Sequence, residues 1–152
     1  MNINETIVAL STAPGAAAIA VIRLSGDKAI NIAEKVFKSR FGKQLSNQGT
    51  HQVLLGDFHY RKTVIDEVLL SVFKNPNSYT GENVVEISCH GSIFVQQKIL
   101  KILQEMGARL AEPGEFTLRA FLNKIMDLAQ AEAVADLIAA ESEAAHHIAV
   151  QH

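Results

Sequence analysis

The sequence contains little cysteine and lacks the loop motifs that bind nucleotide phosphates. Cys89 is its single cysteine, so the chain cannot form an intrachain disulfide. Neither G-x-x-x-x-G-K-S/T nor G-x-G-x-x-G occurs anywhere in it. These residues therefore contain no nucleotide hydrolysis site of the common phosphate-loop type.

Long apolar runs and a strong net charge are also absent. No apolar run approaches the about 20 residues that a transmembrane helix needs, and the first ten residues, MNINETIVAL, lack the basic flank and apolar region of a secretory signal. The formal net charge of −2 gives no global field that would attract a polyanion. A hydrophobic content of 48% is enough to bury a core. We expect a folded cytoplasmic protein with no membrane contact.

The apolar patterns predict an α+β fold built mainly from an antiparallel sheet with packed helices. Period-two or continuous apolar patterns predict strands at residues 5–12, 18–24, 53–60, 63–73, 83–89 and 108–111. Periods of three and four predict helices at residues 27–38, 93–106 and 115–123. Gly107 stands where a helix C-cap is expected, and Arg61-Lys62 separate two strands that form a hairpin.

A further helix is predicted to start near Asp127 and to run to the end of the sequence. Asp127 and Gln130 approximate a capping box. The helix that follows is Ala-rich, has no stop signal, and needs a partner to bury its apolar face. We therefore expect the chain to be a fragment in which a first domain is followed by the start of an all-helical unit.

The segment SYTGENVVEISCHGS, residues 78–92, places a carboxylate, a thiol and an imidazole close together. Because alternate residues of a strand face opposite sides, Glu86, Ser88 and His90 share one face and Cys89 points away from them. A Cys89–His90 catalytic dyad is therefore not expected, and Cys89 is predicted to be a buried packing residue.

Metal binding is not predicted either. Glu86 and His90 stand about 13 Å apart in a strand at ~3.3 Å per residue, too far to share an ion. His146 and His147 are adjacent, and adjacent residues do not share a helix face. We predict no metal site and no catalytic residue in this chain.

Two charged side chains in apolar strands remain ambiguous on pattern alone. Glu86 either faces solvent or points into a pocket. Arg23, in AIAVIRLSG, either extends its stem at a strand end or presents its guanidinium to an anionic ligand.

Three blocks resemble the MnmE (TrmE) family of tRNA modification GTPases: ETIVALSTAPGAAAIAVIRLSG, SYTGENVVEISCHGS and PGEFTLRAFLNKIMDLAQAEAVADLIAA. The resemblance implies an N-terminal tetrahydrofolate-binding and dimerisation domain at residues 1–122, similar in fold to the folate-binding domain of aminomethyltransferases. Residues 123–152 would be the truncated start of a helical domain, and the family's GTPase domain is absent from this sequence.

The resemblance also implies a function for the intact protein. It would be a GTPase that uses Mg²⁺ and K⁺ and that joins the flavoprotein MnmG (GidA) in a heterotetramer or larger complex. Together they would place an aminomethyl-type group on C5 of the wobble uridine of tRNA. The one-carbon unit would come from a tetrahydrofolate, in its 5-formyl or 5,10-methylene form. The fragment itself is expected to bind folate and to form a homodimer without GTPase activity. The alternatives are a free-standing folate-dependent aminomethyltransferase-like enzyme and a structural dimerisation module without a ligand.

The resemblance maps the family's three folate contacts onto positions of this sequence. Its arginine corresponds to Arg23 and its glutamate to Glu86, which we expect to accept two N–H groups of the pterin. Its basic link residue falls on Ile125, with Lys124 just before it as the candidate substitute. A second departure is PGAAA at residues 14–18, where the family commonly has PGRGG.

Overall fold

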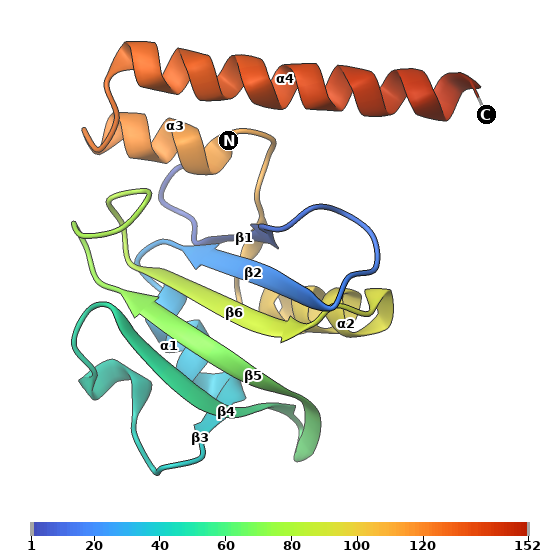
Figure 1. Ribbon diagram of the computed structural model, residues 1–152. Helices are drawn as coiled ribbons and strands as arrows, with labels where there is room; N and C mark the ends of the chain where they lie inside the picture. Colours follow the sequence, from blue (N-terminus) through green and yellow to red (C-terminus); the bar gives the residue numbers. More distant parts are fainter. Residues whose placement is uncertain (1, 152) are drawn as a thin grey trace.

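One seven-stranded sheet forms the centre of the protein, with strand order β3-β4-β5-β6-β2-β1-β7 (Figure 1). The computed structural model describes residues 2–151, and side chains up to residue 140. Its strands are β1 (Ile7–Leu10), β2 (Ile19–Ser25), β3 (Phe37–Ser39), β4 (Gln52–Tyr60), β5 (Thr63–Phe73), β6 (Val84–His90) and β7 (Arg109–Leu110). Neighbouring strands are antiparallel except for the parallel pair β1–β7. The sheet is therefore mixed, and the predicted α+β class is confirmed.

Two pairs of helices flank the sheet in different places. Within residues 2–151 the α-helices are α1 (Ala29–Val36), α2 (Ile93–Glu105), α3 (Glu115–Leu122) and α4 (Leu128–Gln151), and a 3₁₀ turn covers Leu45–Asn47. Figure 1 shows α1 and α2 behind the sheet, and α3 beside α4 at the top of the view. The chain changes direction between α3 and α4, although a domain boundary after residue 122 stays a prediction.

The core lies between the sheet and helices α1 and α2. Alternate residues of the central strands point into it, such as Ile22 of β2, Leu70 of β5 and Ile87 of β6, all fully buried. Since the side chains of a strand alternate, the intervening residues Arg23 and Glu86 lie on the opposite face of the sheet. Neither α1 nor α2 packs on that face.

Local sequence signals set most of the helix ends correctly. Gly107 adopts φ = 116° after α2, as a C-cap glycine does. Asp127 and Gln130 form the predicted capping box: the Gln130 N–H donates to Asp127 Oδ1 at 2.8 Å, and the Asp127 N–H donates to Gln130 Oε1 at 3.0 Å.

The predicted helix over residues 27–38 is too long, because residues 37–39 form β3 instead. As the edge strand of the sheet, β3 pairs with β4: Phe37 lies opposite Phe58, and Lys38 opposite Asp57. Phe37 is buried in β3, and its position in the helical period also predicted a core-facing side chain, so its apolar character did not reveal where the helix stops. Pairing with a distant strand decided the boundary.

Within the described part of the chain, every helix is too short or too polar to cross a membrane.

Gly56 in β4 gives a test of this packing. A Cβ atom built there would lie 2.3 Å from the Lys38 carbonyl oxygen and 2.6 Å from the Phe37 ring. Gly56→Ala should therefore lower the free energy of unfolding by about 2 kcal/mol, because β3 must move away from β4. Urea denaturation followed by circular dichroism measures this change. Gly49→Ala is the control, since no atom lies within 4 Å of its Cβ; equal stability of the two variants would contradict the packing described.

Candidate functional site

Arg23 and Glu86 are direct neighbours on adjacent strands. They are register partners in β2 and β6, and Arg23 donates from Nε and Nη2 to Glu86 Oε2 at 3.1 and 3.0 Å. Their side chains are 21% and 27% exposed. Both hydrogen bonds end on one oxygen, and Glu86 Oε1 accepts none from the described residues.

Glu86 faces a pocket, which decides between the two alternatives that the sequence left open. The pocket has a volume of about 220 Å³ and is lined by Arg23, Phe73, Tyr79, Val84 and Glu86. Phe73 ends β5, and Tyr79 belongs to the loop between β5 and β6. The pocket therefore combines an ion pair with two aromatic rings at one end of the sheet face that α1 and α2 leave uncovered.

Aromatic rings also pack on the guanidinium of Arg23. Its Cζ atom lies 5.1 Å from the ring centroid of Tyr79 and 5.3 Å from that of Phe116, within the range of cation–π attraction. The Tyr79 hydroxyl is 3.2 Å from Thr117 Oγ1. Because Phe116 and Thr117 belong to α3, this helix contacts the arginine of the pocket and the loop beside it.

A second cleft lies on the α4 side of Arg23. Its volume is about 300 Å³, and its lining includes Arg23 and Tyr79 together with Ser11, Phe116 and Ile138. Arg23 and Tyr79 are therefore shared by the two cavities.

A buried ion-pair network fixes α3 beside this site. Arg119 is 1% exposed. Its Nη1 donates to both carboxylate oxygens of Glu82 at 3.1 and 3.2 Å, and its Nη2 donates to Glu115 Oε2 at 3.0 Å. Arg109 donates from Nη1 and Nη2 to the same Glu115 carboxylate at 3.0 and 2.7 Å. Sequence reasoning missed this network, although the Glu115 and Arg119 spacing of four on a short helix was a signal for it.

Glu82 extends the network towards β2. The hydroxyl of Ser25 donates to Glu82 Oε1 at 2.7 Å, and Ser25 Oγ also lies 2.7 Å from Thr80 Oγ1. Ser25 and Thr80 are fully buried. Since Thr80 and Glu82 belong to the same loop as Tyr79, these bonds hold the loop that lines the pocket.

The pKa of Glu115 reflects this environment. Burial of the carboxyl is the largest influence and favours its neutral form. The hydrogen bonds from Arg109, from the Glu112 N–H and from Arg119 together outweigh burial and lower the pKa from 4.5 to about 2. The carboxylate is therefore ionised at neutral pH although it is fully buried.

Ile125 and Lys124 do not line the pocket that contains Glu86. Ile125 is 43% exposed, and its Cγ1 would be 3.0 Å from a Cβ built on Gly81. The preceding Asn123 donates from Nδ2 to the Thr80 carbonyl at 2.9 Å. The link therefore packs against the loop that carries Tyr79.

Cys89 and His90 face opposite sides, as strand geometry predicts. Cys89 is 3% exposed in the core, and burial, with the charge of Asp66, raises the pKa of its thiol to about 11. His90 is exposed, and its Nδ1 lies 2.5 Å from Asp66 Oδ1. In the described part of the chain, no three His, Cys, Asp or Glu side chains are arranged to hold a metal ion. The side chains of His146 and His147 lie outside the described residues.

The fold and the pocket together define an α+β domain with a polar, aromatic-lined pocket on the uncovered face of its sheet. A family described as "GTP-binding protein TrmE N-terminus" matches residues 6–124. The chain belongs to this family.

Curated relatives extend the similarity to nearly the whole chain. It is 58% identical over 151 residues to the tRNA modification GTPase MnmE of Flavobacterium psychrophilum, covering 99% of this chain and 33% of that protein. For the proteins of the same name from Clostridioides difficile and Bacteroides thetaiotaomicron, identity is 48% over 149 residues and 50% over 148 residues. Coverage is 98% and 97% of this chain, and 32% of each relative. The chain spans about a third of the length of these relatives.

The low pKa of Glu115 predicts acid sensitivity. Its contribution to stability is fully present above about pH 4.5 and is lost as pH falls towards about 2, because the unfolded state then binds a proton that the folded state resists. We expect Glu115→Gln to lower the free energy of unfolding by about 3 kcal/mol at pH 7. The difference in free energy of unfolding between the wild type and Glu115→Gln should shrink as pH falls from 4.5 to 2. Urea denaturation at a series of pH values measures this difference, and a difference independent of pH would contradict the assignment.

Proposed function

We propose that this chain is the folate-binding and dimerisation region of an MnmE-type tRNA modification GTPase. Its membership of the TrmE N-terminal family and its relatives' names support the connection with tRNA modification. The observation that carries the folate proposal is the pocket in which the Arg23–Glu86 pair lies beside two aromatic rings. The ligand is a tetrahydrofolate derivative, in its 5-formyl or 5,10-methylene form.

The residues of the pocket suit the pterin end of a folate. A pterin presents a ring N–H beside an amino group, and a carboxylate can accept from both. Glu86 is such a carboxylate, with Oε1 facing no donor among the described residues. Phe73 and Tyr79 supply flat apolar surfaces for the ring system. At about 220 Å³ the pocket is smaller than sites that enclose a drug-sized ligand, so it suits one end of the folate.

Arg23 supplies a positive charge at the boundary between the pocket and the cleft under α4. It can bind carbonyl or carboxylate oxygens of the folate, because guanidinium stays charged at any physiological pH. The family's third, basic contact falls on Ile125, which has no charge. Lys124, exposed in the same link, is the candidate to supply that cation.

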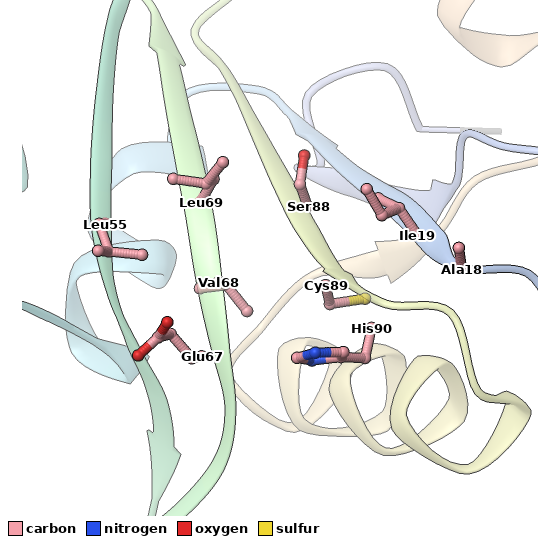
Figure 2. A pocket seen from close by; sticks show the side chains of 9 residues that line it. All are labelled: Ala18, Ile19, Leu55, Glu67, Val68, Leu69, Ser88, Cys89 and His90. Atoms are coloured by element: carbon pink, nitrogen blue, oxygen red, sulfur yellow. The ribbon is translucent and has the colours of Figure 1, made fainter.

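The uncovered face of the sheet supports homodimerisation. Three aliphatic side chains are exposed on it: Ile19 at 64%, Val53 at 60% and Leu69 at 47%. A cleft of about 280 Å³ lies among Ile19, Leu69, Ser88 and His90 (Figure 2). Apolar side chains gathered on one sheet face suit contact with a second copy of the same surface.

The remaining activities belong to the intact protein. GTP hydrolysis, with Mg²⁺ and K⁺, is assigned to a region outside the part of the relatives that this chain matches, which is 33% of the first relative's length. The complex with MnmG, the binding of tRNA and the modification of the wobble uridine complete the proposal, in the cytoplasm.

Calorimetry with 5-formyltetrahydrofolate tests the role of Glu86. The wild-type chain should bind, and Glu86→Gln should weaken binding at least about tenfold, because an amide cannot accept two charge-assisted hydrogen bonds. Glu67→Gln is the matched control, since Glu67 is an exposed carboxylate on the same sheet face that does not line the pocket. No binding to the wild type, or unchanged binding by Glu86→Gln, would reject the folate proposal.

Sedimentation velocity tests dimerisation separately. At micromolar concentration the wild type should sediment as a dimer, and Leu69→Glu should shift it to monomer, because the interface would then bury an unpaired charge. Phe94→Glu is the control, as Phe94 is 76% exposed on α2, away from the uncovered sheet face. A monomeric wild type would contradict the proposal.

A further inference from the structure

Arg23 forms one wall of two cavities and contacts residues from three parts of the chain. Its ion-pair partner, Glu86, comes from β6. Tyr79 comes from the loop before that strand, and Phe116 comes from α3. Arg23 therefore connects α3 with the pocket.

The ion pair alone does not fix the guanidinium once a ligand enters. Both hydrogen bonds from Arg23 end on Glu86 Oε2. If Glu86 turns its carboxylate towards N–H donors of a ligand, Arg23 loses part of that partner. The two rings do not depend on Glu86, so their attraction for the cation persists.

We propose that Phe116, together with Tyr79, is a positioning residue that holds the Arg23 guanidinium in place for folate binding. The inference rests on the proposed function and assigns a role to a residue of α3 that does not line the pocket itself. A guanidinium held in advance leaves less side-chain freedom to be lost when the ligand binds.

The fold keeps the ring of Phe116 in a defined position. Its two neighbours along the helix, Glu115 and Thr117, are buried. Glu115 is bonded to Arg109 and Arg119, and Thr117 lies within hydrogen-bond distance of the Tyr79 hydroxyl. Tyr79 is therefore tied to the residue next to Phe116, and both rings pack on Arg23.

Substitutions at position 116 separate ring stacking from packing volume. Phe116→Leu should weaken the binding of 5-formyltetrahydrofolate about fivefold, whereas Phe116→Tyr, which keeps an aromatic face, should bind as the wild type does. Phe121→Leu is the matched control. It makes the same change on the same helix, at a side chain that lines a separate groove between α3 and α4. Tyr79→Leu removes the second ring that packs on Arg23, the ring from the β5–β6 loop, and should also weaken folate binding.

A double-mutant cycle tests whether Phe116 acts through Arg23. In an Arg23→Lys background, Phe116→Leu should cost much less affinity than in the wild type, because the planar guanidinium that the ring holds is gone. The Nε–Hε resonance of Arg23, read without ligand, should shift in Phe116→Leu and stay in place in Phe121→Leu, because an aromatic ring displaces the resonances of nearby protons.

The outcomes distinguish this inference from the folate proposal. The positioning role would be overturned if Phe116→Leu lost the same folate affinity in both backgrounds, or if it left the Arg23 resonance unshifted. Either result would leave the proposed folate binding intact. A wild type that binds no folate would overturn the proposed function, and this inference with it.

Discussion

The buried guanidinium of Arg119 is the interaction on which the arrangement of α3 and the pocket loop depends. It bonds Glu115 of its own helix, Glu82 of the loop before β6, and the backbone carbonyl of Glu5 at 2.7 Å. Removing one partner from such a network leaves a buried charge uncompensated, which is costly. The network therefore joins α3 to the loop, and the aromatic residues Phe116 and Tyr79 stand close in sequence to its members Glu115 and Glu82.

Much of the fold could be predicted because its signals are local. Alternation in β2 and β6 placed Arg23 and Glu86 on the face away from the core, and the capping residues at Asp127 and Gln130 located the start of α4. The end of α1 and the parallel pairing of β7 with β1 could not be predicted in the same way. They depend on partners distant in sequence, which periodicity within one segment does not report.

In the candidate site, too, the residues with local signals could be predicted and the contacts between distant segments could not. The resemblance pointed to Arg23 and Glu86, and strand geometry removed Cys89 from consideration as a nucleophile. The ion pair between Arg23 and Glu86 could not be predicted from the sequence. The two residues are 63 positions apart and become neighbours only through the antiparallel pairing of β2 with β6. The spacing of Glu115 and Arg119 indicated at most a pair within one helix, because a helical period does not report charges from distant segments such as those of Glu82 and Arg109.

The position of Arg109 in the chain has a consequence for the order of assembly. It pairs along β1 in the sheet and bonds Glu5 across 104 positions at 2.8 Å. Contacts of such separation close late, since the whole loop between them must first be confined. On a ribosome, the first strand must wait for nearly the entire domain to be synthesised before its outer edge is covered. Until then β1 remains an open edge that other chains could pair with.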